Sequence, residues 1–315
     1  MTVRITKPEF NLREKISELD KPTGVKGNEL LRSETSQEVR NLIGAGRKNY
    51  IINGDFQISQ RGNYTSATTV ANQTYYLDRW TVDVAGVGAT IQQKVNQSVG
   101  NSSGNYYKNT VKMEATSSAT GYLQLRQKME LHKSLFGKTV TVSAWVKSNH
   151  SNVRLRTEGG HVTGNWDSLQ SHSGNGQWEK LSMTIPLTSN PSHLRFGILI
   201  WGSTGGPSAN HAQGAISSGD YYEFTDYQVE IGENATDFEH RTIGEEVALC
   251  KRYYQQIGPA ADTVMLLSGA GNGNQRIRGS YPLVPEMRVA PDVTVDTSGG
   301  DFLFYAYSGS APTYS

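Results

Sequence analysis

Short segments in which apolar and polar residues alternate are the feature that most constrains the fold of this chain. Thr139–Val146 and Leu181–Leu187 alternate cleanly, and Tyr221–Ile231 does so over eleven residues. Leu194–Trp201 is more continuously apolar, which is typical of a central strand. In an extended chain successive side chains point to opposite faces, so a strand with one buried face shows this period of two. The pattern therefore predicts β structure from Tyr50 to about Ile231.

Turn-forming clusters separate these segments. Gly, Asn and Ser gather at 101–105, 172–176 and 202–207, and the chain holds 33 glycines among 315 residues. Such residues suit tight turns because they tolerate the backbone angles that turns require. Many short strands at this spacing predict an all-β fold, a jelly-roll β-sandwich.

Composition excludes several classes of protein. A net charge of +1 is too balanced for nucleic-acid binding driven by electrostatics. No apolar run is long enough for membrane insertion, and Met1–Lys7 lacks the apolar run of a signal peptide. We therefore expect synthesis in a cytoplasm. Cys250 is the single cysteine, which excludes an intramolecular disulfide and a multi-cysteine zinc site, and its helical surroundings predict a buried thiol.

Residues 1–48 differ from the β region because they are rich in charge and poor in glycine. Apolar stripes predict one short helix within Glu9–Asp20 and a second that begins at Thr35, with Glu38 as its capping-box partner. Helices this short do not fold alone. Residues 1–48 are thus either a disordered tail or an arm that folds on a partner. The docking residues of such an arm would be Leu12, Ile16, Leu19, Val39, Leu42 and Ile43.

The region after the β segments is expected to begin with a helix. Glu245–Gln256 has helical character, and a loop rich in Gly and Asn follows at 268–274. Residues 276–315 return to strands, but they are too few for an independent β domain. We accordingly expect a docking arm at 1–48, a jelly roll at 49–243, a connecting helix at 244–258 and a partial C-terminal β region at 259–315.

No motif in the sequence supports catalysis. Gly100–Gly104 matches the G-x-S-x-G pattern, but polar loop flanks it where a buried strand and a helix are needed. The seven histidines are scattered and form no H-E-x-x-H motif. Acidic residues are sparse in the β region, and nothing marks a pair of glycosidase carboxylates. We predict that the protein is not an enzyme and assign no catalytic residue.

Aromatic residues in loops are the main candidates for ligand binding. Trp80 and Trp145 fall in strand-like surroundings and are expected in the core. Trp166 lies in a polar stretch, where packing explains it least, and Tyr106 and Tyr107 flank another polar loop. Exposed aromatic rings are frequent binding residues, and sugars bind flat aromatic faces together with a few polar groups.

Several segments in combination resemble a group of bacteriophage tail fibre or virion appendage proteins. The segments are Arg47–Gly62, Tyr76–Trp80, Gly121–Leu125, Gly137–Lys147 and Phe238–Glu246. This resemblance implies a jelly-roll domain of the carbohydrate-binding-module type, mounted on a virion and commonly trimeric. The arm at 1–48 looks like the leader that joins such appendages to other tail proteins.

The same resemblance implies a structural calcium ion. In jelly-roll carbohydrate-binding modules the first and last strands lie side by side and often share Ca²⁺, and Asp55 and Asp226 occupy the matching places. The alternative is that Asp55 caps a turn and Asp226 faces solvent. Arg278–Pro291 resembles the start of the family's C-terminal β tip, which is here either truncated or completed by neighbouring subunits.

Taken together, these features predict a phage virion structural protein, a tail fibre or appendage. It would dock on other virion tail proteins through residues 1–48, assemble as a homotrimer and adsorb to host surface glycan. Two alternatives remain open: a purely structural adaptor or decoration protein without receptor binding, and a polysaccharide depolymerase.

Overall fold

The computed structural model describes residues 32, 48–100, 106–118, 120–130, 133–161, 164–202, 214–256, 270–271, 277–278, 283–293, 305–307 and 312–314. The chain divides into two compact units, Met1–Lys48 and Asn49–Ser315. All six predicted docking residues belong to the first unit and lie outside the described residues.

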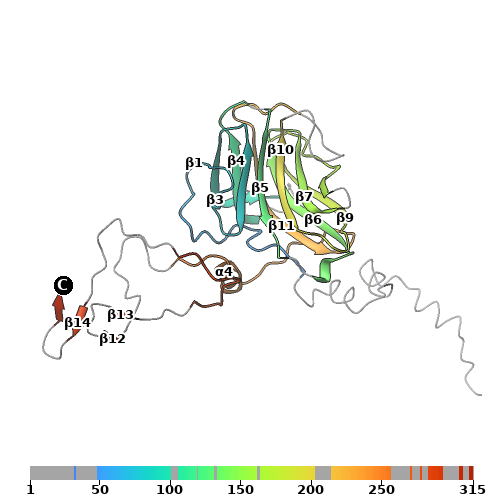
Figure 1. The fold of residues 1–315 in the computed structure, drawn as a ribbon. Helices are drawn as coiled ribbons and strands as arrows, with labels where there is room; N and C mark the ends of the chain where they lie inside the picture. Colours follow the sequence, from blue (N-terminus) through green and yellow to red (C-terminus); the bar gives the residue numbers. More distant parts are fainter. Residues whose placement is uncertain are drawn as a thin grey trace, which may run out of the picture. The chain divides into compact units, whose positions relative to one another are not determined.

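Two antiparallel sheets form the main body of the second unit (Figure 1). In the described part of the chain, one sheet has six strands in the order β1-β3-β4-β11-β6-β9, so that the last of these strands in the sequence, β11, is inserted between β4 and β6. Its strands are β1 (Thr68–Thr69), β3 (Ala89–Val99), β4 (Tyr106–Ala115), β11 (Tyr221–Ile231), β6 (Thr139–Ser148) and β9 (Trp178–Pro186).

The second sheet has five described strands in the order β2-β5-β10-β7-β8. Its middle strand, β10, was predicted to be central from its continuous apolar character. The strands are β2 (Trp80–Ala85), β5 (Tyr122–Lys128), β10 (Arg195–Trp201), β7 (Val153–His161) and β8 (Gly164–Asp167). A short 3₁₀ turn, η1 (Lys133–Leu135), precedes β6.

The predicted all-β jelly-roll sandwich is confirmed. The inward-facing side chains of both sheets form one continuous apolar core, and β11 has the same bounds as the alternating segment in the sequence. Beyond the sandwich, two short strand pairs are described: β12 (Ala270–Gly271) with β13 (Ile277–Arg278), and β14 (Tyr305–Tyr307) with β15 (Pro312–Tyr314).

An aromatic cluster forms the centre of the core. Trp80 is fully buried, as predicted, with its ring centroid 5.2 Å from that of Phe56 and 5.3 Å from that of Tyr227. The indole nitrogen of Trp80 donates a hydrogen bond to the carbonyl of Asn53 at 2.8 Å, which satisfies its one polar group.

The prediction that Trp145 lies in the core is wrong. In β6 the core residues include Val142, Ala144 and Val146, and because side chains alternate, Trp145 lies half-buried on the opposite face.

The first and last segments of the sandwich lie side by side. The amide of Tyr227 donates to the carbonyl of Gly54 at 2.9 Å. A Cβ atom at Gly54 would lie 2.3 Å from the carbonyl oxygen of Tyr227, so only glycine permits this close approach. The resemblance predicted this adjacency.

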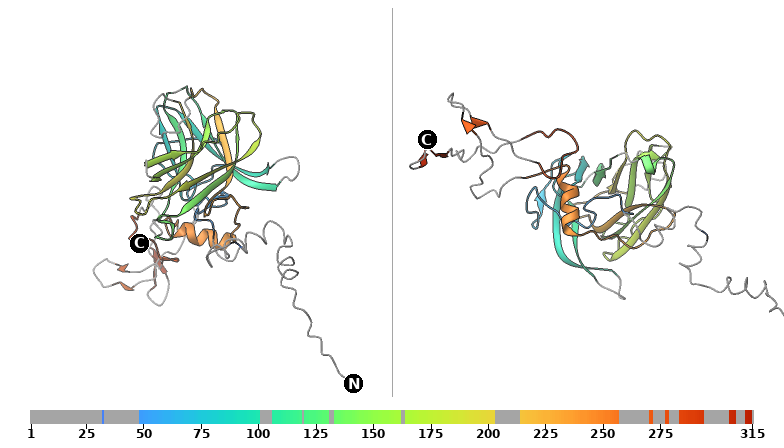
Figure 2. Two further views of the ribbon diagram at one scale, coloured as in Figure 1. Left: turned by 90° about the vertical axis from the view of Figure 1, so that its right-hand side faces the viewer. Right: turned by 90° about the horizontal axis from the view of Figure 1, so that it is seen from below.

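Helix α4 (Ile243–Lys251) packs at one end of the sandwich (Figure 2). It begins earlier than predicted because Thr242 and Glu245 form a complete capping box, and it ends at Lys251. Glu246 accepts a hydrogen bond from the amide of Asn53, and Arg241 pairs with Glu246 at 3.2 Å. Cys250 is 1% exposed, as expected for a structural thiol. No described helix combines the length and apolar composition of a membrane-spanning segment.

Candidate functional site

The face of the five-stranded sheet that points away from the core carries an unusual set of side chains. In β10, Phe196, Ile198 and Ile200 enter the core, so the residues between them lie on the opposite face. We call this the outer face. Its members discussed below are Asp83, Tyr122, Gln124, Arg126, Arg156, Glu158, Asp167, Arg195, Gly197 and Trp201.

Glu158 is the centre of a charged network on the outer face. Its carboxylate lies 2.8 Å from Arg126 Nη1, 3.1 Å from Arg195 Nη1 and 3.3 Å from Arg156 Nε. Gln124 Nε2 donates a further hydrogen bond at 2.9 Å. Burial raises the pKa of Glu158, but the arginines and the amide outweigh that effect and hold the pKa below its usual value. Glu158 is therefore ionised at neutral pH.

Two aspartates complete the network at its two sides. Arg126 Nη1 lies 2.5 Å from Asp83, and Arg156 Nη1 lies 2.9 Å from Asp167. Asp83, Asp167, Arg156 and Glu158 are all less than 10% exposed. Buried charges of this kind persist only when they are paired and hydrogen-bonded, and these are. The network thus holds its side chains in fixed positions.

Gly197 makes room for this network in the middle of the sheet. Its register partners are Arg126 on β5 and Arg156 on β7. A Cβ atom at Gly197 would lie 2.4 Å from the carbonyl oxygen of Leu125 and 2.8 Å from Arg126 Cα. The missing side chain allows guanidinium groups from both neighbouring strands to converge on Glu158.

A pair of stacked aromatic rings borders the network. Tyr122 and Trp201 are register partners on β5 and β10. Their ring centroids are 4.9 Å apart with the planes only 10° from parallel, and both residues are half-buried. The hydroxyl of Tyr122 donates to Asp83 Oδ1 at 3.2 Å, and burial together with Asp83 raises the pKa of Tyr122. A half-buried aromatic pair therefore lies directly beside fixed donors and acceptors.

The predicted aromatic binding residues lie elsewhere. Trp166 belongs to the edge strand β8 instead of a loop, and its partner in the register is Thr157, on the core side of β7. Its half-buried ring packs against the core and lies 4.2 Å from His161 between centroids. Tyr106 and Tyr107 begin β4, and their side chains lie outside the described residues. Ligand binding by these three residues stays a prediction.

Asp55 and Asp226 come together as the resemblance implied. Asp226 is 5% exposed and Asp55 is 7% exposed, so the alternative in which Asp226 faces solvent is wrong. Burial raises the pKa of Asp226, the Lys108 ammonium that pairs with it lowers it, and the nearby Asp55 raises it. Asp226 has a φ of 53°, in the left-handed region, at an irregularity of β11.

The site around Asp55 and Asp226, which we call the aspartate corner, has one feature that fits a cation. Asp226 Oδ1 is buried without a hydrogen-bond partner, whereas the other carboxylate oxygen pairs with Lys108. In the described part of the chain, no three acidic, histidine or cysteine side chains gather around a common point, so further ligands for Ca²⁺ would have to be backbone carbonyls or water. Calcium binding at Asp55 and Asp226 stays a prediction.

Sequence reasoning missed Tyr122 and Trp201. The sequence contained part of the information needed. Trp201 lies an even number of residues from Arg195 and Gly197 in β10, so all three side-chain positions are on the face that points away from the core. Their stacking depends on the register between β5 and β10, which are more than sixty residues apart in the sequence. That pairing is not visible without the fold.

No family model matches this chain, and no curated protein matches it. Similar solved structures include the enzymatically active domain of bacteriophage CBA120 tailspike protein 4, at 9% identity and a TM-score of 0.37, covering 58% of this chain and 21% of that one. Another is TmCBM61 in complex with β-1,4-galactotriose, at 12% identity and a TM-score of 0.34, covering 59% of this chain and all of that one. A third is the C-terminal family 22 carbohydrate-binding module of Clostridium thermocellum Xyn10B, at 10% identity and a TM-score of 0.33, covering 53% and 99%.

Proposed function

We propose that the protein is a non-catalytic glycan-binding protein whose saccharide site is the outer face of the five-stranded sheet. The observation that carries this proposal is the stacked pair Tyr122 and Trp201 beside the buried charged network. Aromatic faces attract the C–H faces of sugar rings, and nearby polar groups select among hydroxyl patterns. Asp83 accepts the hydrogen bond of the Tyr122 hydroxyl, Arg126 pairs with Asp83, and the Arg156 guanidinium lies 5.8 Å from the ring centroid of Trp201.

Preorganisation favours binding at this face. Because the network already fixes Asp83, Arg126 and Glu158, little side-chain entropy remains to be lost when a saccharide binds. The stacked rings restrict each other in the same way.

The electrostatics of the face favour binding over hydrolysis. A glycosidase needs one carboxyl group with a raised pKa as general acid and a second as nucleophile or base. Glu158 has the opposite shift, and Asp83 and Asp167 are each paired with an arginine. These carboxylates are suited to holding positive charge and hydroxyl groups in place.

The virion role rests on the resemblance of the sequence. We infer a tail fibre or appendage in which residues 1–48 dock on other tail proteins. The protein would be located in the virion, and a homotrimer would present several copies of the outer face to host surface glycan. Several linked weak sites increase the overall affinity without any new contact.

Glycan-array and host-cell binding by the full chain would test the glycan site. Trp201→Ala should weaken binding by about tenfold or more, because one stacking face is lost. Trp145→Ala is the matched control, since this tryptophan is also half-buried but lies on the outward side of the other sheet. Equal binding by the wild-type protein and a folded Trp201→Ala variant would contradict the site. No binding by folded wild-type protein would favour the structural adaptor.

A second experiment tests the arm in the full-length protein. The double variant Leu12→Asp, Leu42→Asp places charge in both predicted apolar stripes and should prevent incorporation into particles without changing glycan binding. Normal incorporation would refute the role of the arm.

A further inference from the structure

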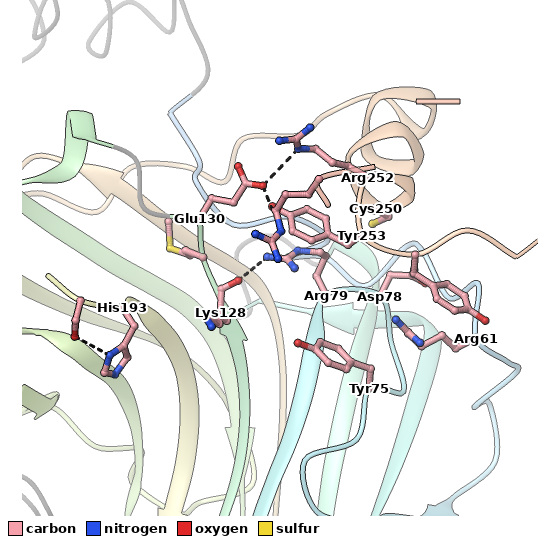
Figure 3. A pocket seen from close by; sticks show the side chains of 14 residues that line it. Arg61, Tyr75, Asp78, Arg79, Lys128, Glu130, His193, Cys250, Arg252 and Tyr253 are labelled. Atoms are coloured by element: carbon pink, nitrogen blue, oxygen red, sulfur yellow. Dashed lines mark hydrogen bonds and ion pairs between the residues drawn. The ribbon is translucent and has the colours of Figure 1, made fainter. Parts of the chain in front are cut away.

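A pocket built from residues other than the outer-face pair and its network lies where α4 meets the sandwich (Figure 3). Its volume is about 730 Å³, within the range of small-molecule sites. Its walls come from the segment before β2, the end of β5, the residues after α4 and the C-terminal segment that contains Arg288. The hydrogen bond from the amide of Arg288 to the carbonyl of Arg252, at 2.9 Å, joins the last two walls.

Positive charge dominates this pocket. Five cationic side chains line it, against two acidic ones, Asp78 and Glu130. Asp78 accepts hydrogen bonds from the neutral Gln60 and lies near Arg61, and Glu130 lies 3.4 Å from Arg252. Because the cationic side chains outnumber the acids, a surplus of positive charge remains, which an anion entering the pocket would meet.

Arg79 gives the clearest indication that this pocket suits an anion. It is 8% exposed, and its Nε–H is buried without a hydrogen-bond partner. Its Nη2 donates to the carbonyl of Lys128 at 2.5 Å, and the guanidinium stacks 3.5 Å from the ring centroid of Tyr253 (Figure 3). A buried guanidinium normally binds a carboxylate or phosphate through its paired N–H groups.

The backbone at Arg79 supports the same conclusion. Its φ is 75°, a left-handed conformation that costs a non-glycine residue about 1 kcal/mol or more. Such strain is retained mainly where a side chain must point in a required direction. Burial also lowers the pKa of Arg79, and an anionic partner would relieve the cost of holding this charge in the pocket.

Arg61 forms a second cationic wall with aromatic support. Its guanidinium lies 3.7 Å from the ring centroid of Tyr254 and 5.2 Å from that of Tyr75. Its Nε is also buried without a hydrogen-bond partner. Two arginines, each stacked on a tyrosine and each with an unused N–H group, thus line one pocket.

We propose that this pocket binds the carboxylate of an acidic saccharide, such as a uronic acid, with Arg61 and Arg79 as the carboxylate-binding pair. The size of the pocket fits one or two sugar rings. Tyrosine, serine and histidine side chains in its wall can contact the sugar hydroxyls, among them Tyr75, Ser192 and His193. The site is independent of the outer face and would give the protein a preference for negatively charged glycan.

Calorimetric titration of the full chain with trigalacturonic acid and with its methyl ester tests this proposal, because esterification removes the charge of each carboxylate and adds only a methyl group to it. We expect the acid to bind and the ester to bind at least tenfold more weakly. Arg61→Gln should reduce binding of the acid at least tenfold. Arg288→Gln, in the C-terminal wall, should reduce it less, because Arg288 already contacts Glu130. Lys180→Gln removes one positive charge outside the pocket and should have no effect.

Three results would overturn the proposal: no binding of the acid by folded protein, equal binding of the ester, or inorganic sulfate or phosphate competing at the concentration of the trisaccharide. The last result would indicate a site for simple anions. Acid binding by the Trp201→Ala variant distinguishes binding in this pocket from binding at the outer face. Loss of acid binding in Trp201→Ala but not in Arg61→Gln would place the saccharide on the outer face and refute the pocket.

Discussion

Glu158→Gln is the most informative single change in the sandwich. It keeps the shape of the side chain and one acceptor oxygen but removes the negative charge that faces Arg126, Arg156 and Arg195. Arg156 is 3% exposed, so water cannot replace the lost partner. Asp83 and Asp167 still pair with Arg126 and Arg156, so the variant leaves three arginines facing two carboxylates and one positive charge of the network without its partner.

The expected loss of stability follows from this burial. Removing one partner of a buried ion pair costs about 3–5 kcal/mol. For a domain of this size each kcal/mol lowers the melting temperature by about 2–4 °C, so the melting temperature should fall by roughly 6–20 °C. An exposed pair has little effect, and Glu114→Gln, which breaks the surface pair with Lys112, should cost at most about 1 kcal/mol.

Urea unfolding of the full-length variants, followed by tryptophan fluorescence, measures the difference. A loss below about 1 kcal/mol in Glu158→Gln, equal to that of the Glu114→Gln control, would refute the view that the network is a buried and coupled unit.

The pH dependence gives an independent check. Because the pKa of Glu158 is lower in the folded protein than its usual value of 4.5, the unfolded chain binds its proton more readily. The stabilisation is complete above the unfolded pKa and is lost as the pH falls through the folded pKa. The stability of the wild-type protein should thus decrease more steeply below pH 4.5 than that of Glu158→Gln.

Two further predictions concern buried groups outside the network. Burial raises the pKa of the Cys250 thiol, so it should react with a thiol reagent at pH 8 at least a hundredfold more slowly in native than in denatured protein; comparable rates would contradict its burial. Calcium at millimolar concentration should raise the melting temperature of the wild-type protein but not of Asp226→Asn, because Asp226 Oδ1 is buried and unpaired. An unchanged wild-type melting temperature would contradict calcium binding by Asp226.

The alternation of apolar residues was sufficient to predict the strands and the class of fold. β11 matches its sequence segment, and β10 is central as its apolar character indicated. The face on which an individual side chain lies was harder to predict. Trp145 is a large apolar residue in an alternating strand, but it lies on the outward side of the sheet. The size and hydrophobicity of a tryptophan favour burial, but the neighbours Ala144 and Val146 occupy the core positions of this strand.

The binding residues were harder to predict because they depend on contacts between distant segments. Asp55 and Asp226 were placed together through a resemblance, since no local pattern joins them. Arg61 and Arg79 meet Tyr253 and Tyr254 only because α4 packs against the end of the sandwich. An isolated arginine in a loop has no feature in the sequence that distinguishes it from a solvated surface residue.

The central position of β11 affects how the protein must be made. Because β11 lies between β4 and β6, the strands on its two sides have no direct pairing with each other. A ribosome that has synthesised residues 1–220 has produced both halves of the six-stranded sheet but not the strand that joins them. Until Tyr221–Ile231 emerge, β4 and β6 are open edges that can pair with other nascent chains. Slow translation just before β11 should therefore favour aggregation, and chaperone binding should be needed most at that stage of synthesis.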